Sequence, residues 1–314
     1  MVMINTNSKI YVAGHNGMLG SAILRELKKK GYRKLITIDK KRLDLRNQKA
    51  VKKFLKIKKP DAVIIAAAKV GGIKANIEFP ANFINDNLLI QTNLISLSHA
   101  YKVKKLILFG SSCIYPKHFK KKIKENQILT GTLEETNESY AIAKIAGIKM
   151  IEAFNKQFNT SYMCLMPCNL FGPNDNYDLK NSHFLPALIK KIYLASKKKN
   201  KIVKLWGTGK PLREVLHVDE VANACEFFLK KKIKDSLINI GSPIEMSIKE
   251  YANYIRKKID PKVSIKFNNN KKLDGVMRKK LNIDLATRYG WRSKMNFSRA
   301  LDRIIGDFRF SQKK

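Results

Sequence analysis

Residues 9–30 read KIYVAGHNGMLGSAILRELKKK, which is an apolar run, a glycine-rich turn and an amphipathic segment in that order. The apolar run at 9–13 predicts a buried strand, and 21–30 predicts a helix. The glycines permit a tight turn and let an anion approach the free N–H groups at the helix N-terminus. This order predicts a dinucleotide-binding unit whose turn contacts the cofactor through Gly14, His15, Asn16, Gly17, Met18, Leu19 and Gly20.

The pattern of a strand followed by a helix continues along the chain. Apolar runs predict further strands at 34–38, 61–68, 105–109 and 163–166, and helical periodicity predicts helices at 82–100 and 141–158. Alternating strands and helices predict an α/β fold, here a Rossmann-type doubly wound parallel sheet with right-handed crossovers.

A turn-rich stretch at 167–175 indicates a crossing to a smaller C-terminal α/β lobe that binds the substrate. We expect residues 1–168 plus about 212–240 to form the cofactor-binding Rossmann domain. The second lobe is then expected to comprise about 169–211 plus 241–314.

Three polar residues around the end of the strand at 105–109 suit the interconversion of a carbonyl and an alcohol. Tyr140 and Lys144 are one helical turn apart on one face, so the ammonium can lie beneath the phenol and favour its ionised form. This predicts Tyr140 as a proton donor at neutral pH, with Ser111 bonding the same substrate oxygen. Ser112 is expected to contact the cofactor. Tyrosine and lysine also meet at this spacing on many solvated helix faces, so the pattern gains its weight from the rest of the chain.

Residues 39–42 read DKKR at the position where the adenosine ribose is expected. Asp39 suits a ribose 2′-OH and favours NAD, whereas the cations at 40–42 suit a 2′-phosphate and favour NADP. Since charge-assisted contacts to a phosphate are stronger than one hydroxyl hydrogen bond, we predict that the cations outweigh Asp39. The cations are Lys40, Lys41 and Arg42.

Length and cysteine content favour an ordinary globular protein. At 314 residues and 44% hydrophobic content, the chain can bury a sizeable core. No stretch approaches the roughly 18 apolar residues of a membrane helix, and no targeting segment is evident, so we expect a cytoplasmic protein without membrane contact. The cysteines lack a metal-ligand pattern with histidine, so no metal site is predicted and reduced thiols are expected.

The formal net charge of +38 raises the possibility of a nucleic-acid partner. The excess is mostly lysine in short runs typical of helix ends and loops, without a basic tail or interleaved stacking aromatics. We therefore expect no nucleic-acid partner.

Taken together, these segments resemble the GDP-L-fucose synthase family of extended short-chain dehydrogenases/reductases. The resemblance extends to about Arg278 and rests on AGHNGMLGSAI, AAAKVGGI, FGSSCIYP, SYAIAKIAGIKM, HFLPALI and WGTGKPLREVLHVDE. It implies a 3,5-epimerase-4-reductase that takes GDP-4-keto-6-deoxy-D-mannose to GDP-L-fucose with NADPH.

The resemblance also implies roles for individual residues. The catalytic set of the family falls on Ser111, Cys113, Tyr140, Lys144 and His183, with Cys113 and His183 as the epimerisation pair. Guanosine and diphosphate contacts fall on Lys191, Trp206, Arg213 and Asp274. The remaining cofactor contacts are expected at Asp44, Leu45, Phe109, Gly110, Ser111, Lys144, Pro167, Asn169, Leu170 and His183.

The predicted partners are a GDP-sugar, NADPH/NADP and a second copy of the chain. The segment 141–158 has apolar residues on more than one side, so one side is left for a partner helix. We expect a homodimer formed through the helices at about 82–100 and 141–158.

Three positions depart from the family pattern. Asn16 stands where arginine is usual, which removes one contact to a cofactor phosphate. Lys191 also replaces an arginine, keeping the charge but losing the bidentate geometry. Residues 272–282 read KLDGVMRKKLN in place of a KPDGTPRKLLD-like segment, which alters part of the nucleotide pocket.

Two other functions remain open from the sequence. One is a sugar-nucleotide 4-epimerase or 4,6-dehydratase that retains NAD, although no carboxylate replaces Cys113 near the tyrosine. The other is a catalytically idle, basic nucleic-acid-binding protein, against which the set Ser111, Tyr140 and Lys144 argues. Cys113 could also be a buried packing residue, and His183 a helix-start residue.

Overall fold

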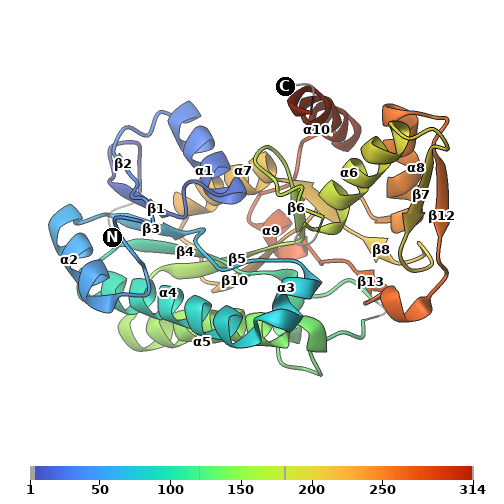
Figure 1. Cartoon of the computed structure of the whole chain (residues 1–314). Helices are drawn as coiled ribbons and strands as arrows, with labels where there is room; N and C mark the ends of the chain where they lie inside the picture. Colours follow the sequence, from blue (N-terminus) through green and yellow to red (C-terminus); the bar gives the residue numbers. More distant parts are fainter. Residues whose placement is uncertain (1–3, 120, 180–181, 313–314) are drawn as a thin grey trace.

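The computed structural model describes residues 4–119, 121–179 and 182–312. Its centre is a six-stranded sheet in the order β10-β5-β4-β3-β1-β2, in which every neighbouring pair is parallel (Figure 1). The strands are β1 (Ile10–Ala13), β2 (Leu35–Ile36), β3 (Ala62–Ile65), β4 (Lys105–Phe109), β5 (Tyr162–Pro167) and β10 (Leu237–Ile240). The predicted doubly wound parallel sheet is confirmed.

Helices cover both faces of this sheet. The helices of this region are α1 (Met18–Lys29), α2 (Gln48–Lys58), α3 (Ile73–Glu78), α4 (Pro80–Ala100), α5 (Glu138–Phe158), α7 (Val218–Leu229) and α9 (Asp284–Arg288). The long pair α4 and α5 runs along one face, and α1 and α7 lie side by side on the other (Figure 1). Buried on both faces, the strands carry continuous apolar runs, as parallel strands usually do.

Two predicted elements differ from the structure for physical reasons. The apolar run at 61–68 forms strand only to Ile65. The N–H of Ala66 still donates to the Ala13 carbonyl oxygen at 3.0 Å, and Ala66, Ala67 and Ala68 line a cavity beyond the strand. The six-residue helix α3 was not predicted from the sequence, since it lies between Gly72 and Pro80 and is too short for a periodic pattern.

A second, smaller lobe has its own core. Its helices are α6 (Phe184–Ser196), α8 (Ile248–Ile259) and α10 (Phe297–Ser311), and its strands are β7 (Ile202–Leu205), β8 (Leu212–Arg213), β11 (Met246–Ser247), β12 (Ser264–Phe267) and β13 (Arg278–Lys279). The strands β6 (Asn169–Phe171) and β9 (Val215–His217) pair with each other in parallel. Short 3-10 turns occupy Ser112–Ile114, Glu125–Gln127, Glu135–Asn137 and Lys271–Leu273.

The second core is built from side chains of α6, α8 and α10, among them Ile189, Ile255 and Leu301. The two cores are separate clusters of buried residues, and Leu281 and Trp291 near the C-terminus pack on the first. Within the described ranges, no helix is both long and apolar enough to cross a membrane.

A buried amide fastens the edge of the sheet to the loops above it. Asn239 of β10 is 0% exposed and accepts a hydrogen bond from the Tyr115 hydroxyl at 2.6 Å. Its amide donates to the carbonyl oxygens of Ile123 (3.0 Å) and Asn282 (3.2 Å). Buried polar groups of this kind are costly to leave unpaired, so Asn239 holds three distant segments together.

Asn239→Leu should therefore lower the free energy of unfolding by about 1–3 kcal/mol, because the similar-sized side chain leaves the buried Tyr115 hydroxyl without a partner. Urea denaturation measures the change. Asn7→Leu, in an exposed turn, is the matched control and should change stability by less than about 0.5 kcal/mol. Equal, small effects of the two substitutions would contradict this role for Asn239.

Candidate active site

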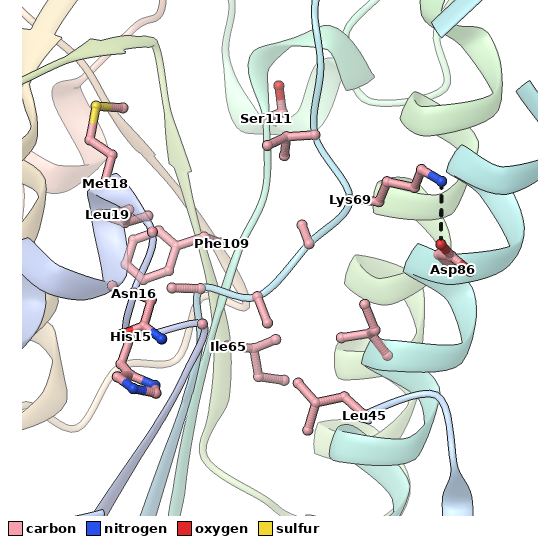
Figure 2. A pocket seen from close by; sticks show the side chains of 18 of the residues that line it. His15, Asn16, Met18, Leu19, Leu45, Ile65, Lys69, Asp86, Phe109 and Ser111 are labelled. Atoms are coloured by element: carbon pink, nitrogen blue, oxygen red, sulfur yellow. Dashed lines mark ion pairs between the residues drawn. The ribbon is translucent and has the colours of Figure 1, made fainter. Parts of the chain in front are cut away.

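A cavity of about 570 Å³ opens at the carboxyl edge of the parallel sheet, where ligands bind in open α/β folds (Figure 2). Most of the predicted cofactor contacts line it: Gly14, His15, Asn16, Gly17, Met18, Leu19, Gly20, Lys40, Asp44, Leu45, Phe109, Gly110, Ser111, Lys144, Pro167, Asn169, Leu170 and His183. Asp39, Lys41, Arg42 and Ser112 are not among its lining residues.

The glycine turn has the close backbone approaches that a dinucleotide site needs. Gly14 has a φ of +83°, and a Cβ there would lie 2.6 Å from the Ala67 nitrogen. A Cβ at Gly20 would lie 2.1 Å from the Gly14 carbonyl oxygen, so a larger residue is excluded at both positions. Gly17 caps α1 without a side-chain hydrogen bond, which leaves the first N–H groups of the helix for an anion. The turn fits a pyrophosphate.

Where the adenosine ribose is expected, the glycine turn contacts the carboxylate of Asp39, which follows β2. The Asn16 amide donates to Oδ1 of Asp39 at 2.7 Å, and Nε2 of His15 lies 3.4 Å from the same oxygen. Of the three predicted cations, Lys40 lines the cavity, whereas Lys41 and Arg42 are exposed outside the lining.

An ion network that the sequence did not reveal supports the end of the cavity where the adenine is expected. The Arg46 guanidinium bonds Asp44 (2.6 Å) and Asp86 (2.9 Å). Figure 2 shows the remaining ion pair, in which the Lys69 ammonium lies 3.6 Å from Asp86. Hydrogen bonding from Arg46 lowers the pKa of Asp44 to about 2, so this carboxylate stays ionised. Asp44 and Arg46 share one loop, whereas Asp86 lies on α4 and Lys69 follows β3, so no signal in the sequence joins them.

Tyr140 and Lys144 lie near the start of α5, under the end of β4. The Lys144 ammonium donates to the Phe109 carbonyl oxygen at 2.9 Å and lies 5.7 Å from the centroid of the Tyr140 ring. Burial raises the pKa of Tyr140, against a smaller lowering by hydrogen bonding with Ser111. Burial also lowers the pKa of Lys144. Desolvation therefore displaces both groups toward their neutral forms, and Tyr140 keeps the proton that it would donate. That Lys144 favours the ionised phenol stays a prediction.

Cys113 and His183 lie in different lobes. Cys113 is buried in the 3-10 turn after Ser111 and is not among the residues that line the cavity. His183 is the N-cap residue of α6 and lines the cavity without a capping bond. Burial raises the pKa of the Cys113 thiol, while the charges of Lys279 and Lys144 lower it.

The cations that act on this thiol were not those expected from the sequence. Burial lowers the pKa of His183, which disfavours the cationic form that was expected to ionise Cys113. Lys279 was missed because it lies in the divergent segment 272–282.

The predicted substrate contacts gather in the second lobe. Lys191 lies 4.8 Å from the centroid of the Trp206 ring, which is 71% exposed and so offers an open face. The Arg213 guanidinium donates to the carbonyl oxygens of Val276 (2.6 Å) and Asp274 (3.3 Å). The Asp274 carboxylate accepts from the backbone N–H and the hydroxyl of Thr208, at 2.7 and 2.8 Å, and thereby orients the loop that carries Trp206.

Comparison with known proteins agrees with this geometry. Residues 10–241 match the NAD dependent epimerase/dehydratase family. The chain is 45% identical over 300 residues to a GDP-L-fucose synthase of Sinorhizobium fredii, covering 96% of this chain and 95% of that protein.

Two solved structures are similar over nearly their whole length. A GDP-6-OMe-4-keto-L-xylo-heptose reductase from C. jejuni has a TM-score of 0.92 and 33% identity, covering 99% of this chain and 100% of that one. A GDP-L-fucose synthetase from Naegleria fowleri bound to NADP has a TM-score of 0.90 and 26% identity, covering 100% and 96%. The chain belongs to the NAD dependent epimerase/dehydratase family and, within it, to the GDP-L-fucose synthase family that its motifs resemble.

Proposed function

We propose that this protein converts GDP-4-keto-6-deoxy-D-mannose to GDP-L-fucose by inverting C3 and C5 and reducing C4 with NADPH. The observation that carries the proposal is the position of Cys113, two residues from Ser111, where the charge of Lys144 lowers the pKa of its thiol and where the thiol acts electrostatically on Tyr140. Tyr140 can then protonate the C4 oxygen of the sugar, and Cys113 can act as the base for C3 and C5, on either side of the C4 ketone. The near full-length similarity to GDP-L-fucose synthases supports the choice of substrate.

In the reduction, the residues of this chain hold and protonate the sugar. NADPH, held along the glycine turn, supplies the hydride when bound. Tyr140 donates its proton to the C4 oxygen, since burial keeps the phenol protonated at neutral pH. Ser111 bonds the same oxygen, and the Lys144 ammonium restores charge balance beside the phenolate that remains.

In the epimerisation, the 4-keto group acidifies the C–H bonds at C3 and C5, so inversion needs a base on one face and an acid on the other. The Cys113 thiolate takes the proton, and Lys279 and Lys144 offset part of the cost of ionising a buried thiol. His183 returns a proton from the opposite face. An anionic diphosphate nearby would favour its protonated form, against the effect of burial.

We infer NADP as the cofactor, with Lys40 as the cation that reaches the 2′-phosphate. The N. fowleri relative is bound to NADP, which supports this choice. An unoccupied Asp39 carboxylate would suit a ribose 2′-OH and favour NAD. The Asn16 amide already donates a hydrogen bond to Oδ1 of Asp39, which leaves this oxygen less available for a ribose hydroxyl.

We also propose a cytoplasmic homodimer whose partners are GDP-sugars. Exposed apolar side chains on α4 and α5, Leu89, Ile142 and Phe158, support an interface through these helices. The cofactor lobe is proposed to comprise 1–168 plus about 212–240, and the sugar-nucleotide lobe about 169–211 plus 241–314.

The similarity to a C. jejuni heptose reductase favours one alternative, a C4 reductase of another GDP-sugar. Such an enzyme reduces the ketone without inverting C3 or C5. Proton exchange separates the two functions, because only epimerisation labilises these positions.

Tyr140→Phe should slow reduction by about 10²-fold or more, the scale of a positioned proton donor, and leave the Kd for NADPH within about twofold. NADPH oxidation and fluorescence titration measure the two quantities. Tyr254→Phe, on α8 in the second lobe, is the control and should leave both unchanged. A Tyr140→Phe enzyme that reduces at the wild-type rate would remove this residue from the mechanism.

The ratio of kcat/KM for NADPH to that for NADH should exceed roughly ten, because charge-assisted contacts are stronger than one hydroxyl hydrogen bond. Lys40→Ala should bring the ratio toward one, whereas Lys41→Ala, outside the cavity lining, should change it little. A preference for NADH in the wild type would show that Asp39 dictates the pocket.

In D₂O without NADPH, the wild type should exchange the C3 and C5 protons of the keto sugar into solvent. Cys113→Ser should lose this exchange, since a serine hydroxyl is a far weaker base, yet still reduce the unepimerised ketone. NMR follows the exchange, and Cys225→Ala on α7 controls for loss of a thiol elsewhere. Exchange of both protons at the normal rate in Cys113→Ser would mean that another group is the base.

A further inference from the structure

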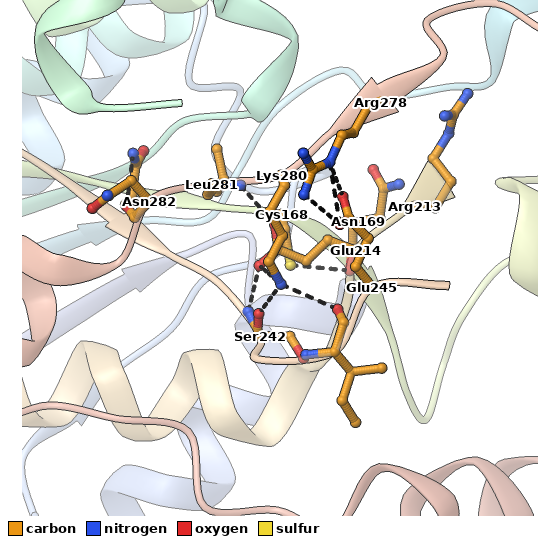
Figure 3. Close-up of polar contacts among 12 residues, drawn as sticks. Cys168, Asn169, Arg213, Glu214, Ser242, Glu245, Arg278, Lys280, Leu281 and Asn282 are labelled. Atoms are coloured by element: carbon orange, nitrogen blue, oxygen red, sulfur yellow. Dashed lines mark hydrogen bonds and ion pairs between the residues drawn. The ribbon is translucent and has the colours of Figure 1, made fainter. Parts of the chain in front are cut away.

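A buried ion pair lies where the chain passes between the two lobes. Glu214, between β8 and β9, is 1% exposed, and Lys280, directly after β13, is also buried. The Glu214 carboxylate accepts from the backbone N–H groups of Ser242 (2.6 Å) and Leu281 (2.9 Å), and the Lys280 ammonium lies 3.6 Å away (Figure 3). The proposed mechanism uses neither side chain.

The pair joins three segments that are distant in the sequence. The Lys280 ammonium donates to the carbonyl oxygens of Ser242 and Ile244, the latter at 3.3 Å. A Cβ at Gly241 would lie 2.3 Å from Oε1 of Glu214, so this glycine permits the close approach. Segments 212–217, 241–244 and 278–281 are thereby fastened together.

Two of these segments carry cations whose placement depends on strand register. β8 and β13 are parallel, with Leu212 opposite Arg278 and Arg213 opposite Lys279. Arg278 bonds Glu245 at 2.8 Å and Lys280 pairs with Glu214. Lys279, between them, is the residue whose charge lowers the pKa of the Cys113 thiol. Burial lowers the pKa of Lys279 itself, and the charge of Arg213 adds to this lowering.

Successive side chains of a strand point to opposite faces, so a slip of one residue would replace Lys279 at the site by one of its neighbours. The positive charges of Arg213 and Lys279 also repel each other. This repulsion would push the two side chains apart if nothing held β8 and β13 in register. Glu214 and Lys280 provide a buried, directional restraint against both changes.

We propose that Glu214 and Lys280 form a positioning pair, which sets β8 against β13 so that Arg213 and Lys279 jointly face the diphosphate of the nucleotide sugar. The inference rests on the proposed function in taking a GDP-sugar as the ligand. Glu214 and Lys280 then affect the affinity for the substrate indirectly, because they position Arg213 and Lys279.

The surroundings of Glu214 make this effect sensitive to pH. The titratable groups that face it are Lys280, Cys168 after β5 and Tyr251 of α8, whose hydroxyl donates to the Arg213 carbonyl oxygen at 3.1 Å. Burial raises the pKa of Glu214 to about 7, while Lys280 and the two N–H donors lower it. As the pH falls through this value, the carboxyl gains a proton and loses its charge toward Lys280, so the restraint weakens.

The test uses the full chain and GDP-mannose, whose diphosphate has no group that titrates near neutral pH. Calorimetry at pH 8 should show that Glu214→Gln binds GDP-mannose at least tenfold more weakly, while NADP⁺ binding stays within twofold. In turnover, the KM for the keto sugar should rise, and kcat should also fall where proton abstraction by Cys113 limits the rate, because the charge of Lys279 acts on this thiol. Lys258→Met, which breaks the exposed pair with Asp302 between α8 and α10, is the control and should leave both affinities unchanged.

Lys280→Met, which keeps the backbone bonds of Glu214, should weaken GDP-mannose binding in the same direction, and it decides the question if Glu214→Gln does not fold. The wild-type affinity for GDP-mannose should fall about tenfold between pH 8 and pH 6, and that of Glu214→Gln should be nearly flat. Protonation of His183 over this range would strengthen anion binding, so it cannot produce the same trend.

Unchanged GDP-mannose affinity in both variants would overturn the proposal, as would a matched loss of GDP-mannose and NADP⁺ affinity, which indicates a general fold restraint. Failure of the proposed function looks different: the wild type then binds GDP-mannose without exchanging the C3 and C5 protons of the keto sugar, which leaves the positioning role intact. A wild type that does not bind GDP-mannose at all would overturn both.

Discussion

The hydrogen bond from the buried Lys144 ammonium to the Phe109 carbonyl oxygen, 2.9 Å long, is the contact on which the rest of the site depends. A buried cation must be paired, and the last carbonyl of β4 is the partner that the fold provides. The bond fixes α5 against the carboxyl edge of the sheet. Tyr140, one turn before Lys144, is thereby brought to Ser111, and the cavity acquires its catalytic end.

Burial governs the chemistry of this end more than pairwise charge does. Tyr140, Cys113 and Lys144 all have pKa values displaced toward their neutral forms by desolvation. A protonated phenol suits a proton donor, but a protonated thiol does not suit a base. In the proposed mechanism, Lys144 and Lys279 therefore matter most for Cys113, because their charges lower the pKa of its thiol, and the part of the second lobe that holds Lys279 would contribute to the epimerisation.

The fold and most of the cofactor contacts could be predicted because they depend on local pattern. The strand, glycine turn and helix at 9–30 are adjacent in sequence, and parallel strands bring their carboxyl ends to one edge. Two sets of ion pairs could not be predicted, because each joins segments that are tens of residues apart. They are the network of Asp44, Arg46 and Asp86 and the positioning pair Glu214 and Lys280. Helical spacing predicts that Tyr140 and Lys144 are close together but not the depth of burial, which raises the pKa of Tyr140. The net charge of +38 does not reveal the site, because most of the lysines are exposed on the surface, whereas Lys144 at the site and Lys280 of the positioning pair are buried.

The most direct test of the account is to identify the nucleotide sugar that the purified protein forms from GDP-4-keto-6-deoxy-D-mannose and NADPH. The account predicts GDP-L-fucose, with NADPH oxidised in equal amount. A GDP-6-deoxy-D-hexose with C3 and C5 uninverted, or no oxidation of NADPH at all, would contradict it.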